Sequence, residues 1–311
     1  MSSIDCEDAF EQYYQNKYDF NTTFLSEEEI DEIKKFAKEK RVDYNLAPLG
    51  TGIFDWILKQ NSNIRFELVN FDSDDIDGML YIPTVGKDSA YIILNANKPL
   101  INQIFTAAHE YYHYEKDYAS FKAKPYVCNF KDLKDVNEKK ACRFAAELLL
   151  PEVALRDEVI SYCKAVAKCQ QKDLSCDEYA VLSIALTVKY QMPLKAVLYR
   201  LFEEGYIKDV DKYIQDYEFI KGILKEITIL EKLVAELYGT ENKYIVSYSS
   251  TYQDMEKAFK AGNATREEII SDAKTLNMNM QLIHEILAED EKEDDVEDNG
   301  DLFALLKSKR G

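Results

Sequence analysis

The chain has 311 residues, of which 39 are basic and 57 acidic, so its formal net charge is −18 at pH 7. A surface this acidic repels phosphate backbones, which argues against direct binding of nucleic acid. The six cysteines include no C-x-x-C pair, which argues against a cysteine zinc site and against a dithiol redox motif. The length allows a sizeable core and two domains.

The beginning of the chain does not have the pattern of a signal peptide. Residues 1–10 are acidic, whereas a signal peptide starts with basic residues followed by an apolar run. No apolar run elsewhere is long enough to cross a membrane. We therefore expect a cytoplasmic protein whose cysteines are reduced thiols.

The first predicted elements are a helix and a small sheet. A capping-box pattern at Ser26-Glu27-Glu28-Glu29 predicts a helix that runs to about Arg41. Three segments then have strand composition and predict a small antiparallel sheet: 65–71, 78–82 and 90–94. Because the strand at 91–94 leads almost directly into the next helix, it is a candidate edge for binding an extended peptide. An ordinary structural strand explains the same pattern.

The motif H-E-x-x-H is formed by His109, Glu110 and His113, which include two of the three histidines in the chain. A helix carries positions i and i+4 on one face, so two imidazoles converge on a metal ion with a carboxylate beside them. Pro99 suits the start of a helix, and residues 100–118 contain neither Gly nor Pro, so one helix can run through the motif. Its apolar residues lie on all sides and predict a buried helix. The alternative is a pair of core histidines held by hydrogen bonds.

A third metal ligand is needed, because a catalytic zinc usually takes three protein ligands and leaves one position for water. The next predicted helix ends at Pro151 and places Glu138 in the middle of its apolar stripe. A buried carboxylate is costly unless it is paired or binds a metal, so Glu138 is the preferred ligand. The alternative is a first-turn acid favoured by the helix dipole. Glu147 points to the opposite side with Lys140 and Arg143, on a predicted solvated ion-pair face. Three further acids are weaker candidates: Asp117, Asp132 and Asp135.

Three sequence blocks follow one another in a set order. They are 103–110, which leads into the histidine motif, 138–151, with the pattern E-x-x-A-x-x-F-A-A-E-L-L-x-P, and 186–207. In these blocks the chain resembles the ImmA/IrrE metallopeptidases over about residues 26–208. The resemblance implies an α+β, zincin-like fold in which His109, His113 and Glu138 bind zinc and Glu110 is catalytic. It also implies that the peptidase cleaves or inactivates a helix-turn-helix repressor, which switches on stress-response or mobile-element genes.

Two departures from the family pattern lie close to the motif. Tyr112 stands where the family often has Gly, and Lys116-Asp117 replaces a Leu-His pair that often follows. The bulky Tyr112 changes the expected shape of the cleft but leaves the expected ligands in place. Zinc would lower the pKa of its water and polarise the scissile carbonyl, while Glu110 would act as general base.

The second half of the chain is predicted to be helical and carries no recognisable chemistry. Residues 177–207 look like a helix-turn-helix, but the net charge and the packing role of this block in the resembled family favour a structural element. Residues 213–238 have one apolar face and predict a long amphipathic helix. A capping box at Thr265 opens another helix, and His284 is interpreted as an ordinary helix residue. Residues 289–301 are mostly acidic and predict a disordered tether.

We therefore predict a peptidase domain at 1–208, a helical C-terminal module at 209–288 and an acidic tail at 289–311. The predicted function is that of a zinc-dependent hydrolase, which cleaves a helix-turn-helix repressor and contacts neither nucleic acid nor membrane itself. One alternative is an antirepressor that captures a regulator without cutting it, and another is a housekeeping peptidase. Retention of Glu110 favours an enzyme, because a pure binder does not need it. The sequence leaves the oligomeric state open.

Overall fold

The computed structural model describes the following residues: 25–42, 46–71, 73, 75–83, 89–123, 126–128, 135–168, 170, 174–210, 213, 228–238, 248–276, 278 and 280–288. The chain forms two compact units. The sheet-bearing unit comprises Thr51–Phe130 and Thr240–Val296, and the helical unit comprises Met1–Gly50, Lys131–Gly239 and Glu297–Gly311. The tail predicted at 289–311 lies outside the described residues, as do residues 214–227 of the long helix predicted at 213–238. The predicted domain limits at 208 and 288 stay a prediction.

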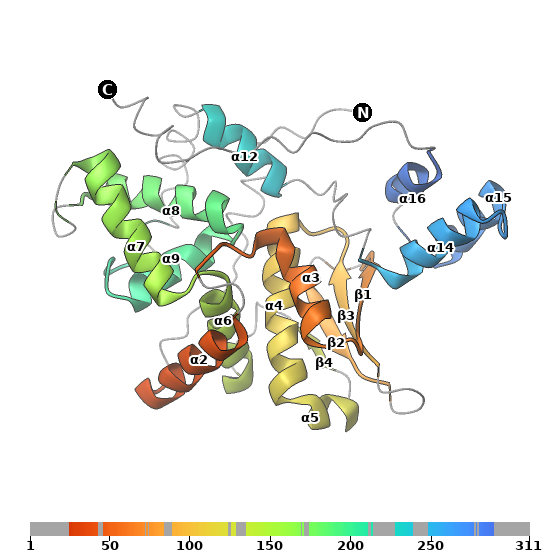
Figure 1. Ribbon diagram of the computed structural model, residues 1–311, viewed down its shortest axis with the longest axis horizontal. Coiled ribbons are helices and arrows are strands. Elements are labelled where there is room, and N and C mark those ends of the chain that lie inside the picture. The colour runs from red at the N-terminus through yellow and green to blue at the C-terminus, as the bar shows by residue number, and fades with distance from the viewer. Residues whose placement is uncertain are drawn as a thin grey trace. The chain divides into compact units, whose positions relative to one another are not determined.

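The sheet of the first unit has four strands in the order β1-β3-β2-β4 (Figure 1). Strand β2 (Gly78–Tyr81) pairs antiparallel with β3 (Ala90–Asn95), as expected. It also pairs antiparallel with β4 (Tyr126–Cys128), a strand that was not predicted from the sequence. Strand β1 (Ile64–Val69) instead runs parallel to β3, so the prediction of a purely antiparallel sheet is wrong for this pair. The chain reverses direction between β1 and β2 and again between β2 and β3. Since β3 inserts between the first two strands, it meets β1 in the parallel direction.

The same strand order corrects the prediction of a peptide-binding edge at 91–94. Strand β3 is paired on both sides, with β1 and with β2, so its backbone groups are already used within the sheet. The outermost strands are β1 and β4. An extended partner therefore cannot add to the sheet at 91–94.

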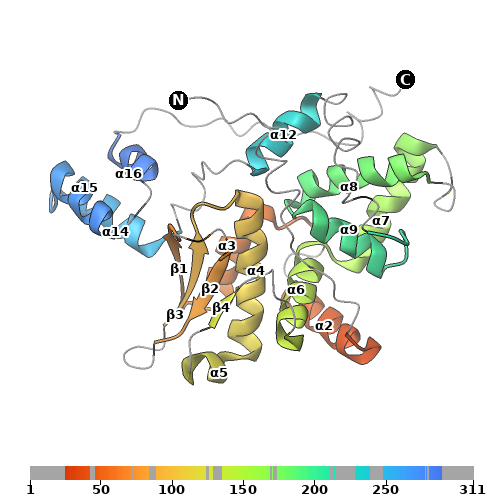
Figure 2. The same cartoon turned by 180° about the vertical axis from the view of Figure 1, so that it is seen from behind.

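One face of the sheet is covered by two helices, α3 (Ile53–Gln60) and α4 (Leu100–Lys116) (Figure 2). Alternate residues of the strands are buried on this side, as the two-residue period of a strand requires. Helix α4 packs tightly against the sheet at Gly78, where a Cβ atom would lie 2.6 Å from both the Ile93 backbone oxygen and Thr106 Cγ2. Any larger residue at this position would require the strand or the helix to shift.

Three C-terminal helices belong to the same unit: α14 (Ser250–Lys260), α15 (Arg266–Thr275) and α16 (Met280–Leu287). Their docking point is the outer strand β1, where Glu67 accepts hydrogen bonds from Ser249 Oγ and Ser250 Oγ. Ser249 also forms a β-bridge with Phe66. The capping box predicted at Thr265 is present and opens α15. The segment after residue 248 therefore covers part of the outer edge of the sheet.

The helical unit contains these described α-helices: α2 (Glu27–Lys40), α6 (Val136–Leu149), α7 (Glu152–Tyr162), α8 (Cys176–Tyr190), α9 (Leu194–Glu203) and α12 (Thr228–Tyr238). The predicted capping box at Ser26 opens α2. Helix α2 packs on α6, where the rings of Phe36 and Phe144 lie 5.0 Å apart. Among the described helices, none is long and apolar enough to cross a membrane alone. Helices α8 and α9 reach the required length and apolar composition only together, and the angle between them is 116°.

Candidate metal centre

Helix α4 carries the histidine motif in a buried environment. It begins after Pro99 and runs unbroken to Lys116, as the absence of Gly and Pro predicts. His109, Glu110 and His113 are each at most 1% exposed. The whole stretch from Leu100 to His113 is buried, which agrees with a helix that is apolar on all sides.

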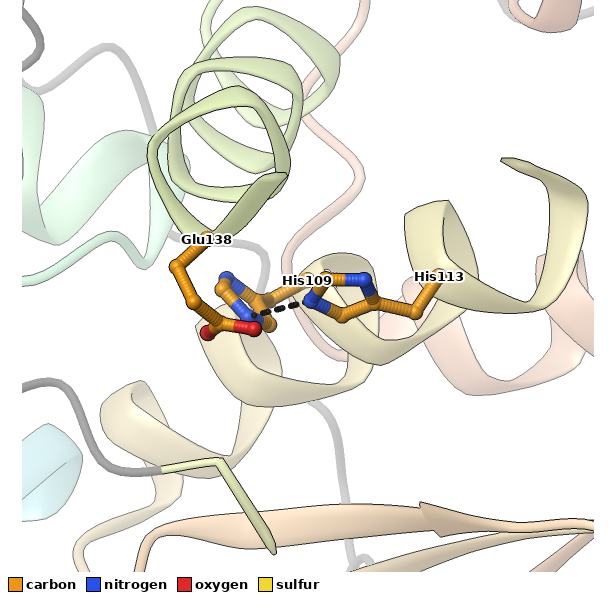
Figure 3. A group of neighbouring side chains, drawn as sticks. All are labelled: His109, His113 and Glu138. Atoms are coloured by element: carbon orange, nitrogen blue, oxygen red, sulfur yellow. Dashed lines mark hydrogen bonds between the residues drawn. The ribbon is translucent and has the colours of Figure 1, made fainter. Parts of the chain in front are cut away.

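The two histidines face one another across one turn of this helix. Their Nε2 atoms lie 3.1 Å apart and their ring centroids 4.9 Å apart (Figure 3). Two nitrogens bound to one tetrahedral zinc at about 2.0–2.1 Å would be separated by roughly 3.3 Å. The observed spacing fits shared coordination, and it equally fits an N–H···N hydrogen bond when no ion is present.

Glu138 lies in the first turn of α6. This helix begins after Asp135, whose side chain accepts a hydrogen bond from the Asn137 backbone N–H at 2.8 Å. Val136 is 48% exposed, whereas Glu138 is 3% exposed, so the buried face of the helix starts at the glutamate. The helix dipole favours an acid in the first turn but does not explain why this acid is buried. A buried carboxylate needs a partner.

Among the described residues, His109, His113 and Glu138 form a group that could hold a metal ion. Each side chain offers one ligand atom, and these atoms all lie within 4.8 Å of one another (Figure 3). Two imidazoles and one carboxylate are a donor set used by catalytic zinc. The residues present therefore fit the ion, and they are the three that the sequence singles out.

Glu147 does not lie on a solvated face, so that prediction is wrong. It is 5% exposed, and its Oε2 lies 2.9 Å from Arg200 Nη2 and 3.4 Å from Arg143 Nη1. Its Oε1 accepts a hydrogen bond from the Glu152 backbone N–H at 2.8 Å. A helical wheel places Glu147 opposite Glu138 but cannot show that α9 packs there and brings Arg200 with it.

Glu147 belongs to a largely buried cluster of ion pairs in the helical unit. Its other members are Lys34, Arg143, Arg200, Glu203 and Glu204. Burial by itself would lower the pKa of Arg200, but the carboxylates of Glu147, Glu203 and Glu204 outweigh it and hold that pKa above its usual range. Arg200 is therefore charged in the folded protein. Burial and the charge of Arg200 lower the pKa of Arg143.

The three weaker ligand candidates have other positions. Asp117 lies beside the outer nitrogen of His113, with its Oδ2 at 2.8 Å from Nδ1. Asp135 caps α6, and Asp132 lies outside the described residues. The contact of Asp117 with His113 was not predicted. Its signal in the sequence is an acid four residues after a histidine on one helix.

The tyrosines of α4 serve packing. Tyr111 is fully buried with its ring 5.2 Å from that of Trp56, and burial raises its pKa well above the usual value. Tyr114 accepts a hydrogen bond from Asn61 Nδ2 at 2.6 Å. Both rings therefore join α4 to the neighbouring α3 segment.

The positive charges of the helix-turn-helix-like block are engaged within the protein. Arg200 is buried in the ion cluster, and Lys189 lies 2.8 Å from Glu158. Lys195 is 8% exposed. The block thus presents little free positive charge among its described residues.

A mixed sheet, a buried helix that carries the histidine motif and additional helices define an α+β fold of zincin type. Residues 60–202 match the family model of the IrrE N-terminal-like domain, Peptidase M78. Over these residues the resemblance to the ImmA/IrrE metallopeptidases seen in the sequence is confirmed. The matched segment is shorter than residues 26–208, the range over which the sequence patterns resemble the family. No curated protein matches the chain.

Proposed function

We propose that the protein is a zinc-dependent peptidase whose metal is held by His109, His113 and Glu138. The observation that carries this proposal is the convergence of these three buried ligands in a chain whose 60–202 segment is a metallopeptidase domain. Zinc bound there supplies a Lewis acid that acidifies water and polarises the scissile carbonyl. The imidazoles act as neutral ligands, and the carboxylate offsets part of the ionic charge.

Glu110 is the proposed general base. It follows His109 on α4 and is 1% exposed, so it lies on the helix that supplies two ligands and is shielded from bulk water. Its carboxylate accepts a proton from the attacking water and passes that proton to the leaving amine nitrogen. A residue in this role is needed for turnover and not for holding the metal.

The proposed substrate is a helix-turn-helix transcriptional repressor, cleaved in the cytoplasm to release stress-response or mobile-element genes. Support comes from the family of residues 60–202 and from the net charge of −18, which favours a protein partner over DNA. The second candidate is a non-proteolytic antirepressor that captures the same regulator. The presence of Glu110 favours cleavage, because binding a regulator without cutting it does not require a general base.

The decisive experiment compares the full-length protein with Glu110→Gln, which keeps the side-chain shape and removes the base. The substrate is a helix-turn-helix repressor, sought first among the proteins encoded by neighbouring genes. We expect both proteins to bind about one zinc and to bind the regulator, while cleavage by the variant falls by about 10²-fold or more. Full inactivation of the regulator by Glu110→Gln in cells would establish the antirepressor instead.

A further inference from the structure

Asp117 and Phe121 both lie next to the ring of His113. Its Nδ1 lies 2.8 Å from Asp117 Oδ2, and its ring lies 5.0 Å from that of Phe121. Its Nε2 faces His109 Nε2 at 3.1 Å. The two ring nitrogens of His113 therefore have different tasks, one directed to a carboxylate and the other to the group of ligands.

The position of Asp117 is set by the backbone at the corner between α4 and α5 (Tyr118–Ala123). Its N–H donates to the His113 carbonyl at 2.8 Å and so ends α4. Its own carbonyl accepts from the N–H groups of Ser120, at 2.9 Å, and Phe121, at 3.1 Å. The same corner thus places both the carboxylate and the aromatic ring against His113.

We propose that Asp117 is a positioning residue for the metal site. An ionised carboxylate only accepts hydrogen bonds, so neutral His113 must carry its proton on Nδ1 to use this contact. The lone pair is then on Nε2, the atom that faces His109. Asp117 thereby selects the tautomer in which His113 can ligate a metal, and its negative charge makes that nitrogen a stronger donor. This inference rests on the proposed metal site.

The competing explanation is that Asp117 only terminates α4 through its backbone. A helix end needs the N–H and the carbonyl of residue 117 but not its carboxylate. If only the backbone of Asp117 matters, removing its carboxylate leaves the His113 tautomer and the metal affinity unchanged. If the carboxylate positions His113, its removal changes both.

The tautomer is measured first, on metal-free full-length protein labelled with ¹⁵N, at a pH where the imidazoles are neutral. Only three histidines contribute signals, and the exposed His284 serves as an internal reference. We expect His113 to carry its proton on Nδ1 in the wild type and to shift toward Nε2–H in Asp117→Ala. A wild-type His113 protonated mainly on Nε2 would overturn the proposal. This readout needs no zinc, so it decides the inference even if the proposed function fails.

Zinc affinity is measured second, by competition with a chromogenic chelator. Asp117→Ala should bind zinc about 10- to 100-fold more weakly, and Asp117→Asn, whose amide oxygen still accepts, about 3- to 10-fold more weakly. The control is Glu256→Ala, which removes a carboxylate from another i,i+4 helix pair, with Lys260, and should leave the affinity unchanged. Should Asp117→Ala fail to fold, Asp117→Asn decides. Wild-type affinity in the variant that folds contradicts the positioning role, whereas absence of zinc binding in the wild type contradicts the proposed function.

Discussion

At the scale of single residues, the two glutamates of α6 have separate tasks. Glu138 lies with the two histidines, and Glu147 lies in the ion cluster with Arg143 and Arg200. Their sequence spacing puts them on opposite sides of one helix. Both sides are buried, so burial alone does not tell the ligand from the ion-pair partner.

This separation predicts different losses on substitution. Glu138→Ala should reduce zinc affinity by more than the roughly 10- to 100-fold expected for an outer-shell partner, because a direct ligand is lost. Glu147→Ala should still bind one zinc but should lose up to about 3 kcal/mol of unfolding free energy, since two arginines lose a buried partner. Zinc content and urea unfolding measure the two effects. Equal zinc loss in both variants would contradict the assignment.

The ion cluster also predicts how stability depends on pH. Burial alone would raise the pKa of Glu204, but the charges of Arg200 and Lys34, at 2.9 and 3.1 Å, outweigh it and hold that pKa below its usual value. A depressed pKa contributes stability that is present above the unfolded value of about 4.3 and disappears as the pH falls through the folded value.

Glu204→Gln should therefore be less stable than the wild type at pH 7, and the difference should shrink as the pH falls below about 4. Urea unfolding of both proteins across this pH range measures the difference in unfolding free energy. The titration of the other acidic residues is common to both proteins and cancels in this difference. A difference that stays constant with pH would show that the charge of Glu204 is not the stabilising feature.

At the scale of elements, the attachment of α14 to β1 is the least expected contact. Glu67 accepts hydrogen bonds from Ser249 Oγ, Ser250 Oγ and the Thr251 N–H, and it lies at the N-terminal end of α14. A carboxylate at this end of a helix satisfies backbone N–H groups and complements the dipole. The ring of Tyr248 lies 5.3 Å from that of Phe54 and extends the contact.

Glu67→Ala should loosen this attachment while leaving the metal ligands untouched. Loss of hydrogen bonds to a charged acceptor costs roughly 2 kcal/mol, which is about a 30-fold change in a local opening equilibrium. We expect faster amide exchange and easier proteolysis in residues 249–260. Glu256→Ala, on an exposed part of the same helix, is the control. Unchanged protection of 249–260 in Glu67→Ala would rule out this role.

At the scale of the whole molecule, the C-terminal part is tied into the sheet-bearing unit through Glu67 and Phe54. Within the helical unit, Tyr238 accepts a hydrogen bond from the Leu194 N–H at 3.2 Å. A chain cut at residue 208 would lose both contacts and expose the buried surface beneath them. Cutting after residue 288 instead removes the acidic tail and leaves these contacts in place.

Zinc should stabilise the protein as a whole, because its proposed ligands come from two helices that are separate in the sequence. At free zinc about 1,000-fold above Kd, binding to the folded state alone adds about 4 kcal/mol. With an unfolding entropy of roughly 2.1 cal/mol/K per residue, chelation should lower Tm by about 6 °C. The matched control is Glu138→Ala, in which the effect of the chelator should be much smaller. Equal Tm changes in both proteins would argue against a zinc site that includes this residue.

The sequence by itself determined the features that depend on near neighbours in the chain. The capping boxes at Ser26 and Thr265 and the unbroken helix through His109 and His113 follow from local spacing and residue type. The similarity of residues 60–202 to the IrrE N-terminal-like domain likewise follows from sequence motifs. Glu138 was singled out because an acid within an apolar stripe is visible on a helical wheel.

Only the tertiary structure decided the features that depend on which segments meet. The parallel pairing of β1 with β3 arises because a later strand inserts between two earlier ones. Glu147 is buried because α9 brings Arg200 from more than fifty positions further along the chain. Side-chain periodicity reports how a residue faces within its own element, whereas burial and strand order depend on the packing of elements that are distant in the sequence.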